Sequence, residues 1–212
     1  MNIFFLDTDP VLAAQYQCDK HVVKMILETA QMLCTAHRVL DGERMYSEKT
    51  KKPLQQYNHP RWHDVLYKCA HINHPSTKWI RATSGNYQWA FAHFCALCDE
   101  YSYRYGKLHE SDKKLRHYLE HTPANITQGE VNLNDFECVA IADDIDSVWK
   151  CKSNPSVVDV YRAYYLYKTT VISPFVYTNR SIPTFLLEMG YDYGAVFTAE
   201  EAPWINELSE SR

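Results

Sequence analysis

Glycine is scarce in this sequence, with 6 residues among 212. Glycine-rich phosphate loops and turn-dense β-sandwiches need more of it, and neither G-x-x-x-x-G-K-S/T nor G-x-G-x-x-G is present. No apolar run approaches the length of a membrane span, so no membrane partner is expected. The opening MNIFFLD reaches acidic residues too early for a secretory signal. We therefore expect the seven cysteines to be reduced thiols in a cytoplasmic protein.

Charge is unevenly distributed along the chain, although its total is only −4. Residues 1–118 hold 16 Lys and Arg against 12 Asp and Glu, whereas residues 119–212 hold 6 against 14. A basic part beside an acidic part fits an anionic ligand bound locally. An ordinary solvated surface would give the same imbalance, so the charge pattern leaves both interpretations open.

Helical patterns dominate, which predicts a mainly α protein folded as one compact domain over residues 1–212. An extended segment, 2–7, leads into a helix at 10–16, with Thr8 or Asp9 as its cap and Pro10 in its first turn. Asp19 is the predicted cap of a long helix over 20–40, which the Asp-Gly pair at 41–42 ends.

The rest of the chain reads as shorter helices joined by polar segments. Residues 43–60 are predicted to form a loop and residues 61–70 a helical segment. Ser76 is the predicted cap of a helix that runs towards Tyr105, breaks or kinks at Ser84-Gly85 and ends at Gly106. Further helices are expected over 111–121, 156–172 and part of 178–190, the last ended by a glycine. Residues 122–155 look irregular, and residues 195–212 form an acidic tail.

The long predicted helix carries its polar residues on one narrow edge. At 100° per residue that edge contains Gln17, Lys20, His21, Lys24, Glu28, Gln31, Thr35 and Arg38, and most other positions are apolar. Such a helix lies in the interior and shows one edge to bulk solvent or to a ligand cleft. The sequence alone leaves these two alternatives open.

The chemical mix on this edge favours the cleft. His21 has an ordinary pKa near neutrality and lies one helical turn from Lys24, which is one turn from Glu28. Opposite charges and partial burial shift pKa values in the way that general acids and bases require. A lysine beside a carboxylate can also act as an amine nucleophile or hold a phosphate. We predict His21, Lys24 and Glu28 as catalytic residues.

The stretch HINHPSTKWIR predicts a second part of the site. Pro75 marks a helix start whose free N–H groups face His74 and could hold a phosphate, and Lys78 and Trp79 could bind a phosphate and a base. The alternative is that Trp79 is core and that Asn73 or His74 caps the turn. The full predicted substrate-binding set is Lys20, Gln31, Arg38, Asn73, His74, Lys78, Trp79, Arg104, Lys107, Arg162, Asn179 and Arg180.

Cysteine and histidine spacing does not complete a known metal motif. Cys69, His71 and His74 are close in sequence, and Cys18-x-x-His21 and Cys95-x-x-Cys98 occur, but no second half of a zinc motif accompanies them. We therefore expect no metal and no cofactor.

The segments DKHVVKMILETAQML and NHPSTKWIRATSGNYQWAFAHFCALCDEYSYRYG resemble the pyrimidine-dimer DNA glycosylase-like proteins of phages and bacteria, of the phage endonuclease V type. The resemblance covers about residues 1–107, a glycosylase-like core, and leaves 108–212 as a helical extension with an acidic tail. It implies a helical fold that bends double-stranded DNA and acts on a flipped-out or modified base. It also implies attack by the N-terminal α-amine on the sugar C1′, assisted by a glutamate that Glu28 would match.

The second residue departs from that mechanism. Asn2 is too large for the usual removal of Met1, which predicts that Met1 is retained and that the amine is not free to react. The expectation therefore leans to a phage DNA-modification enzyme of thymine hypermodification, located in the host cytoplasm. Such a transferase would join an amino acid or amine co-substrate to an activated 5-methyl-pyrimidine in DNA.

Three alternatives stay open at this stage. The first is a pyrimidine-dimer-type DNA glycosylase and AP lyase. The second is a non-enzymatic DNA- or protein-binding module. The third is an enzyme that acts on free nucleotides, for which the negative net charge is an argument.

Overall fold

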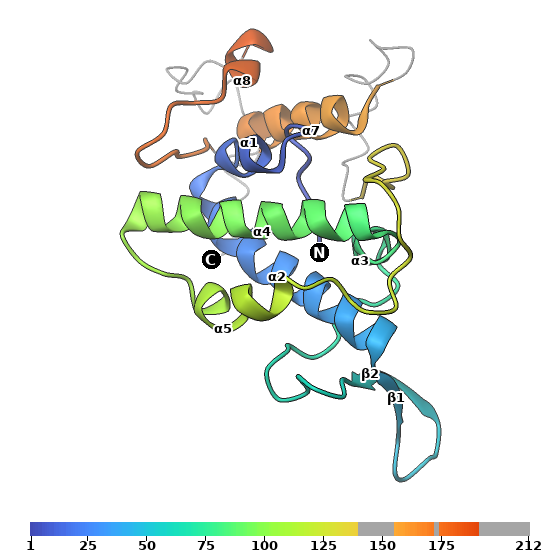
Figure 1. Ribbon diagram of the computed structural model, residues 1–212. Coiled ribbons are helices and arrows are strands. Elements are labelled where there is room, and N and C mark those ends of the chain that lie inside the picture. The colour runs from blue at the N-terminus through green and yellow to red at the C-terminus, as the bar shows by residue number, and fades with distance from the viewer. Residues whose placement is uncertain (140–154, 172–173, 191–212) are drawn as a thin grey trace, which may run out of the picture.

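The computed structural model describes residues 1–139, 155–171 and 174–190, and helices dominate it (Figure 1). The mainly α prediction is confirmed for this part of the chain. Residues 2–6 are an extended, buried entry segment that forms no strand. None of the helices in these ranges is long and apolar enough to cross a bilayer. Residues 122–139 of the predicted irregular stretch, 122–155, form no helix or strand, whereas its residues 140–154 and the acidic tail lie outside the described residues.

The first two helices follow the sequence closely. Helix α1 spans Pro10–Gln15, and the Asp9 carboxylate accepts hydrogen bonds from the backbone N–H groups of Val11 and Leu12, as predicted. Helix α2 spans Asp19–Asp41. Its predicted cap was wrong, because Cys18 is the N-cap residue and makes no side-chain cap. Asp19 instead accepts hydrogen bonds from Arg104 and Thr178.

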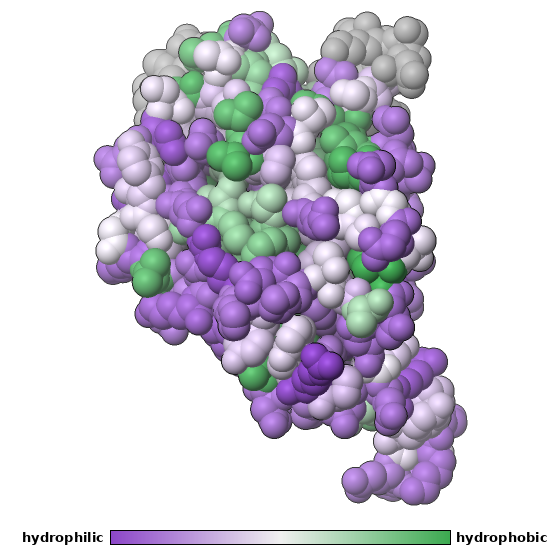
Figure 2. Space-filling model, in the orientation of Figure 1, coloured by the Kyte–Doolittle hydropathy of each residue, from purple (hydrophilic) through white to green (hydrophobic). Residues whose placement is uncertain are grey.

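A β-hairpin replaces the loop that was predicted after α2. Strand β1 spans Glu43–Tyr46 and pairs antiparallel with β2, Pro53–Asn58. The strands are largely exposed, and the hairpin projects from the helical body (Figure 1). Figure 2 shows its projecting end as mainly hydrophilic. Residues 61–65 form turns, and the predicted helix over 61–70 was wrong.

Two helices stand where one interrupted helix was expected. Helix α3 spans Pro75–Ile80 and is capped by His74, and α4 spans Ser84–Tyr105 and is capped by Thr83. Gly85 lies inside α4 and serves a close approach, since a Cβ there would be 2.3 Å from the backbone nitrogen of Val131. Gly106 ends α4 at φ +64°, as predicted.

The remaining helices of the described residues are α5, Glu110–Leu119, α7, Val157–Val171, and α8, Thr184–Glu188. Helix α4 packs against both α1 and α2 and crosses in front of α2 in Figure 1. Phe5 of the entry segment lies in an aromatic core, with ring centroids 4.5 Å from Trp89, 4.6 Å from Phe136 and 5.2 Å from Trp79. The buried entry segment thereby places the N-terminus beside α2.

Candidate functional site at the N-terminus

The N-terminal amine meets the predicted catalytic glutamate. The α-amino nitrogen of Met1 lies 3.5 Å from Glu28 Oε2, and the backbone N–H of Asn2 donates to the same oxygen at 3.1 Å. Lys24 Nζ lies 3.4 Å from the other oxygen, Oε1. The carboxylate therefore has a free amine, a backbone amide and a lysine around it.

Asn2 holds the first residues of the chain beside Glu28. Its side-chain Oδ1 accepts hydrogen bonds from the Ile3 amide at 2.8 Å and from the Tyr161 hydroxyl at 2.7 Å, and its Nδ2 donates to the Val139 carbonyl at 3.3 Å. With only 7% of its surface exposed, Asn2 is a buried anchor. A side chain fixed at three points holds the preceding backbone, so the direction of the amine towards Glu28 is built into the fold.

The two clusters predicted from the sequence lie together here. His74 Nδ1 accepts from the Ser76 amide at 3.3 Å and caps α3. Burial lowers the pKa of His74, and the nearby N-terminal charge lowers it further, whereas Glu28 opposes the shift. The start of α3 is thus an electrostatic neighbour of the amine and its carboxylate.

The exposed edge of α2 beside the amine is both cationic and apolar. Lys20 and Lys24 are exposed, and so are Val23 and Leu27, at 41% and 42%. Glu28 keeps 14% of its side-chain surface exposed. The expectation that only polar residues face outward was therefore incomplete. The edge offers ammonium groups for phosphates beside apolar side chains that could contact a base or a sugar.

His21 lies behind this edge, in the core. Its ring stacks on Phe4 with centroids 4.6 Å apart, and its Nδ1 lies 2.6 Å from the Tyr165 hydroxyl. Burial first, then the charges of Lys168 and Lys24, lower the pKa of His21 to about 3. The structure thus gives His21 a neutral, enclosed ring instead of the near-neutral titration that its position in the sequence suggested.

Several predicted substrate-binding residues are instead committed to structural contacts. Arg38 is 3% exposed and donates to the backbone carbonyls of Tyr57, His63, Leu66 and Tyr67. It holds the segment after the hairpin against α2 and is not available to a ligand.

Arg104 and Arg180 converge on one carboxylate and were also misassigned. Arg104 is 4% exposed and pairs with Glu100 at 2.7 Å and with Asp19 at 2.9 Å. Arg180 binds both oxygens of Glu100, at 2.9 and 2.8 Å. Asn179 stands beside them and accepts a hydrogen bond from the Tyr103 hydroxyl through its carbonyl.

Arg162 and Trp79 serve the core. Arg162 donates to the Leu6 carbonyl at 2.7 Å and pairs with Asp7 at 2.9 Å. Trp79 is 4% exposed and donates its indole N–H to the Asn132 carbonyl, which leaves no open ring face for a base. Lys107 is exposed just after the end of α4. Gln31 is half-buried on the α2 edge, whereas Asn73 and Lys78 are exposed around the start of α3.

The thiols in the described ranges are poor nucleophiles. Burial raises the pKa of Cys34 to about 12 and those of Cys95 and Cys138 to about 11, so they stay protonated at neutral pH. Lys168 is a second amine near the edge, with Nζ 5.6 Å from the Phe4 ring centroid and 5.3 Å from that of Tyr164. Burial lowers its pKa, which makes it the rival of the N-terminal amine.

The N-terminal α-amine is the part of the site that the sequence analysis missed. Asn2 predicted a retained and unreactive N-terminus, yet the same residue anchors the amine against Glu28. No local pattern signals this, because Tyr161 lies on α7 and Glu28 on α2. No protein-family model matches the chain, and neither does any curated protein or solved structure.

Proposed function

We propose that the protein is a DNA glycosylase and AP lyase that uses its N-terminal α-amine as the nucleophile. The observation that carries the proposal is the 3.5 Å approach of the Met1 nitrogen to Glu28, on an edge that exposes Lys20 and Lys24. The resemblance of residues 1–107 to glycosylase-like proteins points the same way. The substrate would be double-stranded DNA with a damaged or missing base.

The chemistry follows from an amine beside a carboxylate. The neutral amine is the nucleophile, and the carboxylate beside it can accept the proton that the attack releases. The amine nitrogen would bond to C1′ of deoxyribose as the glycosidic bond breaks and the base leaves. Glu28 would take the amine proton, the sugar ring would open, and the imine formed would acidify the C2′ proton. Loss of that proton would expel the 3′ phosphate, and water would then release the amine.

Because Asn2 lies beside Glu28, the contact between an α-amine and this carboxylate does not depend on whether Met1 is removed. If Met1 is removed, the nitrogen that becomes the α-amine already lies 3.1 Å from Glu28 Oε2. If Met1 stays, its own amine lies 3.5 Å from that oxygen. The N-terminus presents an amine to Glu28 whether Met1 is removed or retained. A retained Met1 therefore no longer argues against the lyase mechanism.

The base-modifying transferase becomes the second candidate. This reaction requires the amine of a co-substrate beside the general base. In this structure the protein's own α-amine lies next to the proposed general base, Glu28. The exposed Lys20 and Lys24 fit a departing phosphate as well as a DNA backbone, so they do not decide between the two reactions.

Borohydride trapping tests the proposal directly. The full-length protein is incubated with a duplex that contains one abasic site, in the presence of sodium borohydride, and the adduct is digested and mapped by mass spectrometry. We expect one covalent adduct on the N-terminal nitrogen. Two extra residues ahead of Met1 should abolish it, because they move the amine away from Glu28.

Glu28→Gln is the matching side-chain variant. It keeps the size of the residue and should lower the cleavage rate by about 100- to 10,000-fold, the usual contribution of a general base. Glu110→Gln is the control, since Glu110 is exposed and pairs with Lys113 on α5. Thermal melting of each variant separates loss of fold from loss of chemistry. An adduct that maps to Lys168, or cleavage unaffected by the N-terminal extension, would refute the amine mechanism.

A further inference from the structure

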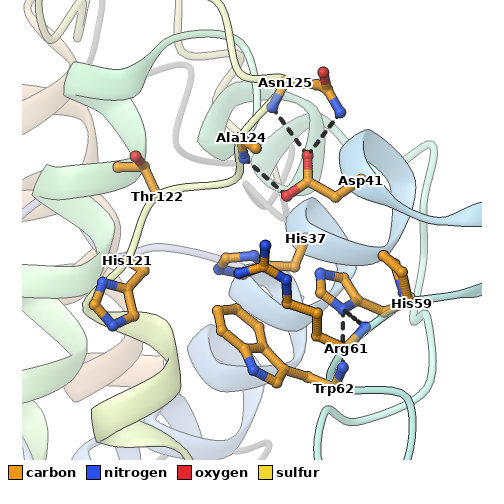
Figure 3. Close-up of a pocket in the computed structure, with 10 residues that line it drawn as sticks. His37, Asp41, His59, Arg61, Trp62, His121, Thr122, Ala124 and Asn125 are labelled. Carbon is orange, nitrogen blue, oxygen red and sulfur yellow. Dashed lines mark hydrogen bonds between the residues drawn. The ribbon is translucent and has the colours of Figure 1, made fainter.

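A pocket of about 450 Å³ lies at the other end of α2 and has no part in the proposed reaction. It forms where the last turn of α2, the turn after β2 and residues 121–125 meet. His37, Asp41 and His59 line it, and each offers a donor atom within 4.8 Å of donor atoms from the other two. In the described ranges of the chain this is the one such group of three metal-ligating side chains. Figure 3 shows both imidazoles below the Asp41 carboxylate.

His37 presents a lone pair that the protein does not use. The Tyr87 hydroxyl donates to the Leu119 carbonyl at 2.9 Å, so its oxygen can accept a hydrogen bond from His37 Nε2, which lies 2.8 Å away. With the ring proton on Nε2, as that bond requires, Nδ1 keeps its lone pair. Nδ1 is buried and has no hydrogen-bond partner among the described residues, although the His121 backbone lies close enough to raise the pKa of the ring against the effect of burial. An unpartnered nitrogen on a side chain that is 1% exposed points to a missing ligand.

Asp41 is held in the orientation that a metal ligand needs. Its Oδ2 accepts from the Ala124 amide at 2.8 Å, and its Oδ1 accepts from the Asn125 amide at 2.9 Å and from the Asn125 side chain at 3.1 Å. Carboxylates that bind metals are oriented by such second contacts, and a lone pair remains on Oδ2, which accepts only one hydrogen bond. Asp41 follows His37 by one helical turn, so α2 itself aligns these two ligands.

His59 comes from a separate segment and now serves as a cap. Its Nδ1 accepts from the Trp62 amide at 3.0 Å and from the Arg61 amide at 3.3 Å, which places the ring proton on Nε2. Binding a metal through Nε2 would move the ring proton to Nδ1, and binding through Nδ1 would displace the two amides, so in either case the turn that His59 caps must shift. The cap of a single turn contributes far less free energy than a well-formed zinc site, so the exchange favours the metal.

We propose that His37, Asp41 and His59 bind one divalent transition-metal ion, with Zn²⁺ as the preferred metal. Two imidazoles and one carboxylate suit Zn²⁺ better than Mg²⁺ or Ca²⁺, which prefer oxygen ligands. Ligand atoms around tetrahedral zinc lie about 3.4 Å apart, so the three donor atoms, now within 4.8 Å of one another, must close by up to about 1.4 Å. The open side of the pocket leaves the fourth position to water.

Arg61 is the group that opposes this site. It lines the pocket and is exposed, so it can turn towards solvent when a cation enters. No sequence motif indicates the site, because only the His37-x-x-x-Asp41 pair is local and His59 reaches it through the hairpin. The expectation of no metal considered other residues, such as Cys69, His71 and His74.

The test is Zn²⁺ titration of metal-free, full-length protein by calorimetry, with Co²⁺ absorption spectra as a second readout. The wild type should bind one Zn²⁺ per chain. His59→Asn removes the imidazole but keeps a side chain that caps well, and Asp41→Asn removes the charge at constant size. Each should weaken Zn²⁺ binding at least about 100-fold, with the fold checked by circular dichroism.

His109→Asn is the matched control, because His109 Nδ1 caps α5 through the Ser111 amide at 3.1 Å and lies in no metal-ligating group of the described chain. Its Zn²⁺ affinity should equal that of the wild type. Three results would overturn the site: no binding by the wild type at micromolar Zn²⁺, unchanged binding in His59→Asn and Asp41→Asn, or a Co²⁺ spectrum with sulfur charge transfer, which would place the metal on cysteines.

Discussion

Acid should destabilise this protein through His93, a buried ring that joins three segments. His93 is 1% exposed, and its Nδ1–H donates to the Pro10 carbonyl at 2.9 Å. Its Nε2 lies 3.1 Å from the Gln17 side-chain nitrogen, which can donate to it, and the ring stacks on Trp89. This arrangement fits the neutral ring. Burial lowers the pKa of His93 to about 4, although the Pro10 carbonyl opposes the shift.

The magnitude follows from linkage. The unfolded chain binds a proton at His93 below its ordinary pKa of about 6.5, whereas the folded protein binds it only near pH 4. Stability is therefore fully present above about pH 6.5 and is lost as the pH falls towards 4. The total loss is about 3 kcal/mol, and about 2 kcal/mol of it falls between pH 7 and pH 5.

The assay is urea unfolding at several pH values between 7 and 4.5, for the wild type and for His93→Asn. Asparagine keeps a donor for the Pro10 carbonyl and cannot titrate, so this variant should be less stable at pH 7 but lose less stability on acidification. His21 has a lowered pKa as well and should preserve part of the slope in both proteins. Parallel curves for the two proteins would show that His93 is not held neutral by the fold.

Three further predictions concern other parts of the molecule. Arg38→Met should lower the free energy of unfolding by about 3–5 kcal/mol, measured by urea unfolding, because the carbonyls that Arg38 satisfies would be left buried and unpaired. Gly106→Ala should cost only about 1 kcal/mol in the same assay, since φ is +64° but no atom lies within 4 Å of the added methyl group. Arg61→Gln should tighten Zn²⁺ binding at least about threefold by calorimetry, because it removes a positive charge from the pocket.

The sequence predicted helices well where the signals are local. Asp9 followed by Pro10 marked the start of α1, and Gly106 marked the end of α4. The hairpin was missed because its strands are exposed on both faces and show no alternation of apolar and polar residues. Gly85 looked like a helix break, but it sits within α4 and makes room for residues 129–131.

The sequence predicted which residue types form the candidate site better than it predicted which of them are buried and which lie together. Glu28 and Lys24 could be recognised from helical spacing alone, and the structure brings them together. The burial of His21 and Arg38 could not be recognised, because the residues that bury them come from distant parts of the chain. The Phe4 and Tyr165 rings pack on His21, and the 57–67 segment covers Arg38. The pairing of the amine with Glu28 depends on the path of residues 1–6 through the core.

The hydrogen bond from Tyr161 to Asn2 joins residues 159 positions apart. Because synthesis proceeds from the N-terminus, the first residue leaves the ribosome long before its anchor on α7 has been made. Until then the amine is therefore open to the enzymes that process new chain ends, and it is aligned with Glu28 only after α7 has been made. An unfinished chain that stops before α7 would carry the same amine and the same glutamate without the contact that fixes one against the other.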